Sequence, residues 1–314
     1  MSTQAIPQGA QLGFVGLGHM GGPMAANLAA AGFDVRGYDP SESARAAAAA
    51  AGVTVVDSVS DAVRGSAAVL TSLPSGALLL KVYRGEEGIL ANAVPGTLLI
   101  DTSTCDVDEA RQASSEASDA GLLALDAPIS GGVVGATAGT LAFMVGGTQE
   151  AFERGAAIFE VLGARAVLCG GSGAGQAVKL CNNMLLAIHQ VGVAEAFALA
   201  QNLGVEPQAF YDVASVATGA CWALNTNCPV PGPVPTSPSN RDYEPGFTVS
   251  LMNKDLGLAL AAVERSGTHA ELGRHAQQIF TAAAEAGDAD RDFSVVYRGI
   301  AERSGLAEPA PTVN

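Results

Sequence analysis

The stretch "GFVGLGHMGGPM", residues 13–24, joins an apolar run to an alanine-rich run with helical spacing. Within it, Gly16, Gly18 and Gly21 have the spacing G-x-G-x-x-G. Between a strand and a helix, such glycines allow a tight turn, close approach of the backbone to a pyrophosphate and close packing of helix on strand. The spacing alone is a weak signal, but here the strand and the helix supply the required context. The stretch therefore predicts a dinucleotide-binding turn.

An acidic residue ends the next apolar run. Asp39 closes the run at residues 33–39 and lies 23 positions after Gly16. A carboxylate at this place accepts hydrogen bonds from the ribose hydroxyls of adenosine and repels a 2′-phosphate. Pro40 and Ser41 follow it, with no arginine directly after, so the sequence favours NAD over NADP. His19 lies inside the turn, where we interpret it as a neighbour of the phosphates rather than a catalytic group.

The order of apolar runs predicts the fold class. In the first half, short apolar runs alternate with helical patterns, which is typical of a parallel sheet with helices on both faces. After Gly175 the strand patterns stop and helical spacing takes over. We therefore expect a Rossmann-type NAD-binding domain at residues 1–172 and an all-helical domain at 173–314. The expected strands are 11–18, 33–39, 67–73, 97–103, 122–128, 141–147 and 165–170, and the expected helices of the second half are 176–201, 207–217, 251–266 and 271–286.

Composition excludes several classes of function. The chain has 314 residues and a formal net charge of −15, and a negative field repels nucleic acid and anionic membrane surfaces. Five cysteines without a C-x-x-C pair indicate reduced thiols and no metal site. The first ten residues do not resemble a signal peptide. The apolar run at 185–200 is interrupted by His, Gln and Glu, so we expect no membrane span and a cytoplasmic protein.

A second glycine-rich stretch, "GGSGAGQAVKLCNN", occupies residues 170–183. A phosphate-binding P-loop would end in Gly-Lys-Ser/Thr, whereas here Gly175 is followed by Gln176 and Ala177. This excludes a P-loop and leaves the lysine that follows to be explained.

Lys179 is one of only three lysines, against thirteen arginines. Desolvation and the positive end of a helix both lower the pKa of a lysine amine, as a general base requires. Asn182 and Asn183 follow at i+3 and i+4, where a helix brings side chains to one face. The alternative is a lysine whose charged end reaches solvent from an interface helix.

Two further segments have two interpretations each. "DAPISGG", residues 126–132, ends a strand with small residues, whose backbone N–H groups can bind a carboxylate or simply form a turn. The segment at 228–247 is rich in Pro, Ser and Asn, and its composition alone equally suits a plain surface loop.

The chain resembles the β-hydroxyacid dehydrogenase family, and within it the 3-hydroxyisobutyrate dehydrogenases. The resemblance implies a 6-phosphogluconate-dehydrogenase-like fold, in which a long interdomain helix joins a Rossmann-type domain to an all-helical domain, and an active site between the two. It also implies a homodimer or homotetramer. It extends from about Leu12 to beyond Phe293 and rests on "FVGLGHMGGPMAANL", "DAPISGG", "GTLAFMVGG", "GAGQAVKLCNNMLLA", "TGACW", "CPVPG" and "MNKDLGLAL".

The resemblance also implies roles for individual residues. Lys179 would be the catalytic lysine. The substrate would be bound by Ser130, Gly131, Gly132, Asn182, Asn183, Trp222 and Phe247. The cofactor would be bound by Gly16, Leu17, Gly18, His19, Met20, Gly21, Asp39, Leu73, Pro74, Thr104 and Lys254. Asn227 stands where close relatives often carry an aromatic residue, and the segment around Arg241 differs in detail, which leaves the side group of the substrate open.

The sequence thus predicts an NAD-dependent dehydrogenase of a small 3-hydroxy acid, with 3-hydroxyisobutyrate, oxidised to methylmalonate semialdehyde in valine breakdown, as the first choice. Serine, 3-hydroxypropionate and tartronate semialdehyde are alternative substrates on the same fold. Imine reduction is disfavoured, because relatives with that chemistry commonly replace the lysine. A non-catalytic NAD-binding module is the alternative from another class.

Overall fold

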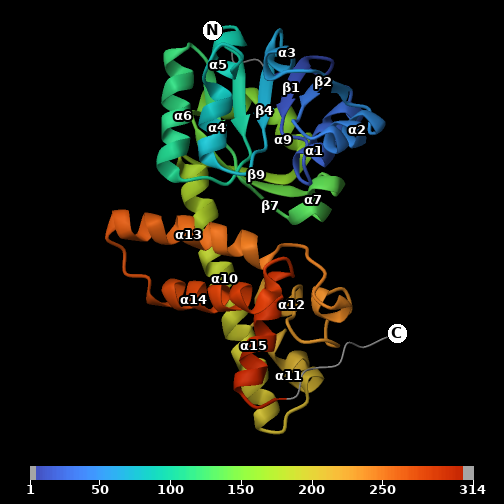
Figure 1. Cartoon of the computed structure of the whole chain (residues 1–314), viewed down its shortest axis with the longest axis vertical. Helices are drawn as coiled ribbons and strands as arrows, with labels where there is room; N and C mark the ends of the chain where they lie inside the picture. The colour runs from blue at the N-terminus through green and yellow to red at the C-terminus, as the bar shows by residue number, and fades with distance from the viewer. Residues whose placement is uncertain (1–4, 307–314) are drawn as a thin grey trace. The chain divides into compact units, whose positions relative to one another are not determined.

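The chain forms two compact units, Met1–Lys179 and Leu180–Asn314. The structure, a computed structural model, describes residues 5–306 (Figure 1). The units meet within one helix, α10 (Ala174–Asn202), rather than at its start. The domain ranges 1–172 and 173–314 follow the start of this helix and stay a prediction.

The N-terminal unit is built on one sheet, with strand order β3-β2-β1-β4-β5-β6-β8-β7 and β9 paired to β8. β1 to β6 run parallel, which confirms a Rossmann-type sheet. The strands are β1 (Gln11–Val15), β2 (Asp34–Tyr38), β3 (Thr54–Val55), β4 (Ala68–Thr71), β5 (Leu98–Asp101), β6 (Leu123–Asp126), β7 (Ile129–Ser130), β8 (Leu141–Gly147) and β9 (Gly163–Gly170).

Helices cover both faces of this sheet. Along β4, Val69 and Leu70 enter different hydrophobic clusters, because successive strand residues point to opposite faces. One cluster includes α1 and α9, and the other includes α4 and α6. The helices are α1 (Gly21–Ala30), α2 (Glu42–Ala50), α3 (Val59–Val63), α4 (Gly76–Tyr83), α5 (Ile89–Asn92), α6 (Val107–Asp119), α7 (Gly132–Ala138), α8 (Gln149–Arg154) and α9 (Ala156–Leu162).

The sheet differs from the expected one in two respects. β3 and β7 were not predicted, because strands of two residues show no periodic pattern. The sheet is also not wholly parallel. β8 runs antiparallel to β6 and to β7, since the chain turns back through the short helix α7 instead of a full crossover.

In the described residues of the C-terminal unit, helices joined by loops form the regular structure, apart from an isolated bridge between Thr248 and Asp292. Its first elements pack beside α10, as the rings of Phe197 and Phe210 show with centroids 4.8 Å apart. The elements after α10 are α11 (Pro207–Ala214), α12 (Trp222–Asn225), η1 (Pro238–Arg241), α13 (Val249–Ser266), α14 (Glu271–Ala283), the π-helical turn η2 (Ala284–Asp288), η3 (Phe293–Val295) and α15 (Val296–Arg303).

The segment rich in Pro, Ser and Asn at 228–247 is not a plain surface loop. Ser237 is fully buried, and its hydroxyl donates to the Cys228 carbonyl at 2.6 Å. The buried carboxylate of Asp292 accepts the Asn227 amide at 3.0 Å and the Phe247 N–H at 3.2 Å. Asn227, noted above as a departure from close relatives, is therefore part of the internal support of this segment.

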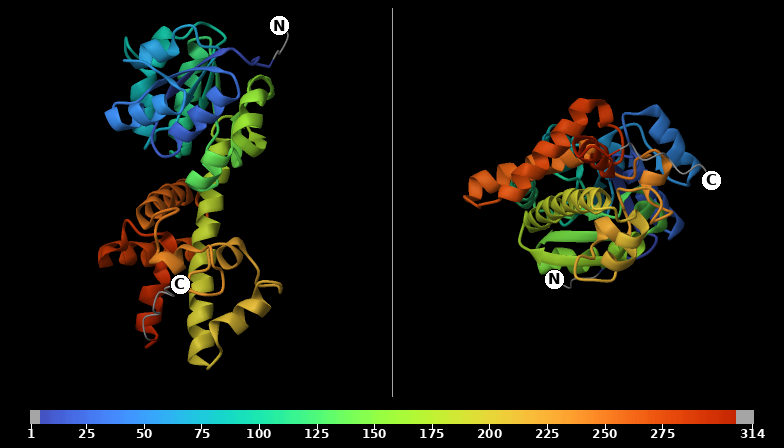
Figure 2. Two further views of the ribbon diagram at one scale, coloured as in Figure 1. Left: turned by 90° about the vertical axis from the view of Figure 1, so that its right-hand side faces the viewer. Right: turned by 90° about the horizontal axis from the view of Figure 1, so that it is seen from below.

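The helix α10 runs uninterrupted for 29 residues (Figure 2). Contrary to expectation, it is long and apolar enough to cross a membrane by length and composition alone, with mean hydropathy 1.3 in its most apolar window. Forty-four per cent of that window is buried in the protein, and the core helices of soluble proteins pass the same test.

Candidate active site

The three glycines of the turn differ in their surroundings. Gly16 has a φ of 96°, and a Cβ there would lie 2.2 Å from the Ser72 carbonyl oxygen. A Cβ on Gly21 would lie 1.9 Å from the Gly16 carbonyl oxygen. Gly18 is exposed, with no atom within 4 Å of a Cβ position, so the backbone there is bare toward solvent. Two glycines are thus required by packing, and the third leaves room for a ligand at the start of α1.

The three other residues of this turn differ in exposure. The side chain of Leu17 is buried in the core, so only its backbone can face a cofactor. His19 is exposed, and Met20 packs against the same core with part of its surface accessible.

Asp39 supports the turn from the end of β2. Its Oδ2 accepts the Leu17 N–H at 2.8 Å, and its Oδ1 accepts the Ser41 N–H at 2.8 Å. Arg45 on α2 donates to the carbonyl oxygens of Asp39, at 2.6 Å, and Pro40, at 3.1 Å. Sequence reasoning searched only the residues directly after Asp39 and missed this arginine, which lies one helical turn into α2.

A buried polar network connects the ends of β4 and β5. Asp101 Oδ1 accepts the hydroxyls of Thr71, at 2.7 Å, and Ser103, at 2.6 Å. The Ser103 hydroxyl in turn accepts the Leu73 N–H at 2.8 Å. Asp101 Oδ2 is buried without a hydrogen-bond partner, and burial raises the pKa of Asp101 to about 6. The loops that carry Leu73 and Thr104, two predicted cofactor contacts, are thereby linked.

At the end of β6 and in β7, the segment "DAPISGG" changes direction sharply. Asp126 is buried and Ser130 is half-buried. Gly131 and Gly132 have φ values of 136° and 61°, in the region that favours glycine. Burial raises the pKa of Asp126, and backbone N–H donors from Gly173 and Gln176 counter part of that rise.

The lysine of the second glycine-rich stretch is buried, with 7% of its surface exposed. Lys179 is the sixth residue of α10, which places it in the second turn, where the effect of the helix end has largely faded.

In the C-terminal unit, several predicted residues share one polar chain. The Asn182 amide donates to Asn183 Oδ1 at 3.1 Å, and the Asn183 amide donates to Asp255 Oδ2 at 2.5 Å. Lys254 Nζ lies 3.7 Å from Asp255 Oδ1. The buried Asp255 was missed by the sequence reasoning, although it follows Lys254 directly.

The two predicted aromatic pocket residues differ in exposure. Trp222 is 53% exposed at the start of α12. Phe247 packs edge-on against Phe293, with ring centroids 5.9 Å apart, in the hydrophobic core. Phe247 therefore has a structural contact that accounts for an aromatic residue there.

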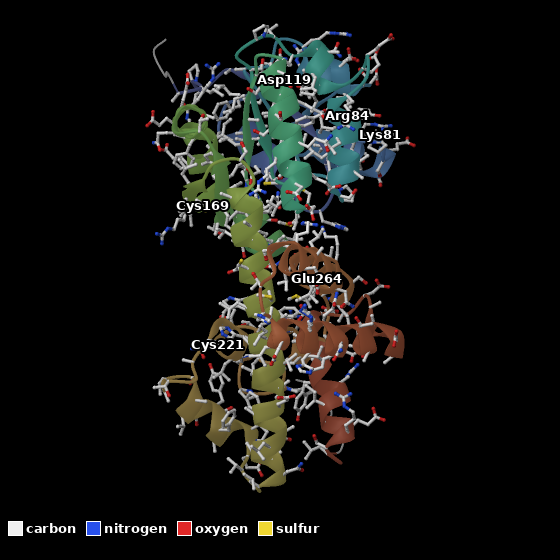
Figure 3. All side chains as sticks on the ribbon, turned by 90° about the vertical axis from the view of Figure 1, so that its left-hand side faces the viewer. Lys81, Arg84, Asp119, Cys169, Cys221 and Glu264 are labelled. Carbon is white, nitrogen blue, oxygen red and sulfur yellow. The ribbon has the colours of Figure 1, made fainter. Side chains whose placement is uncertain are left out.

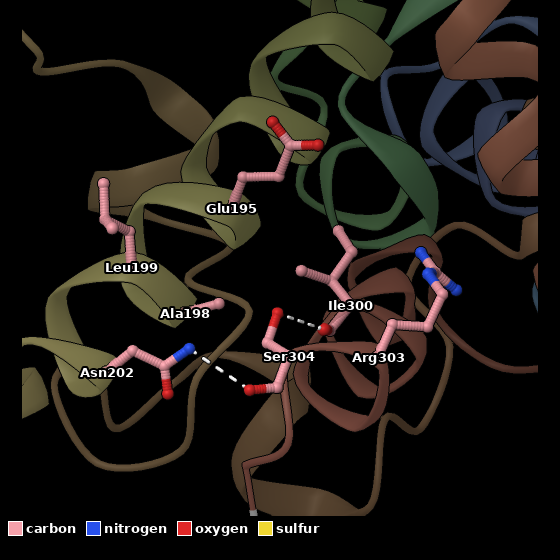
Figure 4. Close-up of a pocket in the computed structure, with 7 residues that line it drawn as sticks. All are labelled: Glu195, Ala198, Leu199, Asn202, Ile300, Arg303 and Ser304. Carbon is pink, nitrogen blue, oxygen red and sulfur yellow. Dashed lines mark hydrogen bonds between the residues drawn. The ribbon is translucent and has the colours of Figure 1, made fainter.

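A surface cavity in the C-terminal unit does not contain any predicted site residue. It has a volume of about 310 Å³ between α10 and α15 (Figure 4). Its lining residues are Glu195, Ala198, Leu199, Asn202, Ile300, Arg303 and Ser304. Among residues 5–306, no group of three or more His, Cys, Asp or Glu side chains could hold a metal ion.

Comparison with known proteins shows the family. Residues 11–171 match the NAD binding domain of 6-phosphogluconate dehydrogenase, and 173–300 match the NAD-binding domain of NADP-dependent 3-hydroxyisobutyrate dehydrogenase. A probable 3-hydroxyisobutyrate dehydrogenase of Mycobacterium tuberculosis is 50% identical over 293 residues, covering 93% of this chain and 98% of the relative. The chain belongs to the β-hydroxyacid dehydrogenase family.

A second relative and a solved structure bear on the substrate. The NAD-dependent L-serine dehydrogenase of Pseudomonas aeruginosa is 42% identical over 288 residues, covering 92% of this chain and 97% of that one. The solved structure of Mycobacterium tuberculosis 3-hydroxyisobutyrate dehydrogenase with L-serine has a TM-score of 0.88 at 50% identity, covering 93% of this chain and 99% of that one.

The family confirms three expectations: the fold, the type of enzyme and the cofactor. The fold is a Rossmann-type domain followed by a helical domain, linked by α10. The chain is an NAD-dependent oxidoreductase that acts on a CH–OH group, and its cofactor is NAD. The bare backbone at Gly18 and the carboxylate of Asp39 fit this cofactor.

Asp101 gives a prediction about stability and pH. Its pKa in the folded protein, about 6, exceeds the ordinary 3.8, so the fold favours the protonated carboxyl. The raised pKa contributes stability to the folded protein. This contribution is fully present below pH 3.8 and is lost as the pH rises through about 6. An asparagine cannot ionise. Between pH 4 and 7, the free energy of unfolding of Asp101→Asn should therefore rise by about 2 kcal/mol relative to the parent.

Urea denaturation at several pH values measures this difference. The exposed Asp119 on α6 provides the control (Figure 3). The free energy of unfolding of Asp119→Asn should differ from that of the parent by the same amount at every pH. If the difference in free energy of unfolding between Asp101→Asn and the parent is also the same at every pH, the prediction is wrong.

Asp39 gives a prediction about cofactor preference. In Asp39→Asn the charge that repels a 2′-phosphate is lost, while Arg45 lies nearby. We expect the ratio of kcat/KM for NAD to that for NADP to fall at least about tenfold. Asp34→Asn, at the exposed start of β2, is the matched control and should leave the ratio unchanged. An unchanged ratio in Asp39→Asn would exclude this residue as the determinant.

Proposed function

We propose that this dehydrogenase oxidises 3-hydroxyisobutyrate to methylmalonate semialdehyde with NAD. The observation that carries the proposal is the 50% identity, over 93% of the chain, to a protein named as a probable 3-hydroxyisobutyrate dehydrogenase. L-Serine is the second candidate, since one relative is named for it and a solved relative was determined with it. 3-Hydroxypropionate and tartronate semialdehyde complete the set of substrates to compare.

Lys179 is the base in this proposal. Bound NAD would supply the acceptor for the hydride that leaves the carbinol carbon. Lys179 Nζ takes the hydroxyl proton, and its burial supports this role, because a desolvated amine more readily becomes neutral. Asn182 and Asn183 follow on the same helix and orient the substrate oxygen.

The backbone at Ser130, Gly131 and Gly132 binds the substrate carboxylate in this proposal. The support is the pair of positive φ values at the two glycines, which only glycine adopts readily and which shape the turn after β7. Trp222 is exposed enough to contact a substrate. For Phe247, the packing on Phe293 favours a supporting role over direct contact.

The cofactor-binding set remains Gly16 to Gly21, Asp39, Leu73, Pro74, Thr104 and Lys254. The linked loops at the ends of β4 and β5 support the assignment of Leu73 and Thr104. With 3-hydroxyisobutyrate as substrate, the enzyme acts in valine breakdown. Five free cysteines fit a reducing compartment, and we place the enzyme in the cytoplasm.

The protein is a homo-oligomer in this proposal, with a second copy packed against an apolar surface of α10 and α11. Leu199 on α10 and Leu203 just after it are 61% and 73% exposed, and Val213 on α11 and Val216 just after it are 66% and 86% exposed. No charged residue occurs between 196 and 205. Two copies with a charge of −15 each repel least where they meet through an uncharged apolar surface.

Substitution of Lys179 tests the chemistry. Lys179→Ala should lower kcat for NADH formation from 3-hydroxyisobutyrate by about 10²–10⁴-fold, the usual contribution of a general base. Lys81→Ala, which removes an exposed lysine of α4, is the control and should keep the kcat of the parent (Figure 3).

Values of kcat/KM for the four substrates, compared in the same assay, decide the substrate. A higher value for serine would move the assignment to that acid. NAD binding without turnover of any hydroxy acid would favour the non-catalytic module, and equal kcat in Lys179→Ala and the parent would reject Lys179 as the base.

Light scattering after size exclusion tests the homo-oligomer. The parent should have a mass of at least twice 31.4 kDa, and Leu199→Asp with Leu203→Asp should reduce it toward 31.4 kDa, since like charges then face each other. Leu272→Asp, at a 65% exposed position of α14, is the control and should keep the parent mass. A monomeric parent would contradict the proposal.

A further inference from the structure

The start of α10 is held by a buried carboxylate from the sheet. Asp126, 6% exposed at the end of β6, accepts the Gly173 N–H with Oδ1 at 2.7 Å and the Gln176 N–H with Oδ2 at 3.0 Å. Both oxygens are used, so the contact fixes the direction of the first turn as well as its position. A neutral serine or threonine would suffice for an ordinary helix cap.

Two glycines allow the backbone to pack closely against this carboxylate. A Cβ on Gly146 of β8 would lie 2.4 Å from Asp126 Oδ1, and a Cβ on Gly175 would lie 2.9 Å from Oδ2. Both glycines admit the close approach of backbone to carboxylate. A charged group enclosed in this way is costly to bury unless its hydrogen bonds are satisfied, which the helix start provides.

A second contact ties the same turn to the loop after β5. Gln176 is fully buried; its Oε1 accepts the Cys105 N–H at 3.1 Å, and its Nε2 donates to the Ser103 carbonyl at 2.7 Å. These two backbone groups flank Thr104, and Ser103 also accepts the Leu73 N–H. One chain of hydrogen bonds therefore connects the loops after β4 and β5, α10 and the end of β6.

We propose that Asp126 and Gln176 are positioning residues that fix Lys179 relative to the loop carrying Thr104. Lys179 lies three residues after Gln176 on the same helix, so a rotation or shift of the first turn moves its Nζ. A displacement of about 1 Å in a reacting group can reduce a rate about 10²-fold. This inference rests on the proposed function, because it takes Lys179 as the base.

Two variants disturb the contacts with little change in volume. In Asp126→Asn, an NH₂ group replaces one of the two carboxylate oxygens, so one of the backbone N–H groups loses its acceptor. In Gln176→Glu, the side chain loses the N–H donor that binds the Ser103 carbonyl. Ser66→Ala is the matched control. It removes another buried hydrogen bond of this unit, to the Ala62 carbonyl, at the opposite end of the parallel strands.

Kinetics of the full-length enzyme give the first test. In both variants kcat should fall about 10–100-fold while KM for the hydroxy acid changes less than about threefold, and Ser66→Ala should retain the parent kcat. In the Lys179→Ala background, adding Asp126→Asn should lower kcat less than about twofold, because its effect acts through the lysine. If the double variant instead loses kcat by the product of the two separate decreases, Asp126→Asn causes general structural damage and the proposal is wrong.

Hydrogen exchange gives a test that does not depend on turnover. Peptides covering 173–180 and 102–106 should exchange faster in Asp126→Asn and Gln176→Glu than in the parent, and at parent rates in Ser66→Ala. If the parent oxidises none of the hydroxy acids, the proposed function fails, while the exchange still reports whether these residues fix the turn. If hydrogen exchange is unchanged in both variants, the positioning role is wrong, whatever the activity. If Asp126→Asn does not fold, the result for Gln176→Glu decides alone.

Discussion

The contact between the Asp126 carboxylate and the first N–H groups of α10 joins the sheet to the helix on which the candidate base lies. The carboxylate is buried, so its charge must be met by donors, and the free N–H groups at a helix start are the nearest ones available. Asp39 acts similarly on the glycine turn and Asp101 on the loops after β4 and β5. Acidic residues at strand ends thus set the positions of the loops that carry the proposed ligand-binding residues.

This arrangement follows from the direction of the strands. β1, β2, β4, β5 and β6 are parallel, so their carboxyl ends lie along one edge of the sheet, where doubly wound folds bind their ligands. A loop at this edge must leave backbone groups exposed for a ligand and still hold its shape. Buried carboxylates satisfy both requirements, because they fix the loop from the inner side.

Much of the fold could be predicted from the sequence, because long apolar runs and helical spacing are strong signals. The strands beginning at Gln11, Asp34, Ala68 and Leu98, and the long helix after Gly173, all lie where their patterns indicated. β3 and β7 are too short to show a pattern, and the reversed direction of β8 depends on pairing between distant residues. The burial of Ser237 depends on the Cys228 carbonyl, which composition cannot reveal.

For the candidate site, sequence motifs identified the residues expected to touch ligands but not those that hold them. Gly16, Gly18 and Lys179 belong to recognisable local spacings. Asp101 and Gln176 act through partners about 30 and 70 positions away, and neither residue type is unusual where it occurs. One sequence signal could have identified the buried carboxylates, because an aspartate ends each of the apolar runs "TLLID" and "LLALD".

The continuous helix α10 has a practical consequence for dividing or recombining this enzyme. Because the two compact units meet between Lys179 and Leu180, in mid-helix, a cut at that boundary would create two new helix ends with unsatisfied backbone groups. A chimaera that exchanges substrate specificity between relatives should therefore take all of Ala174–Asn202 from one parent. That parent should also supply β6, so that the carboxylate and the helix start remain matched.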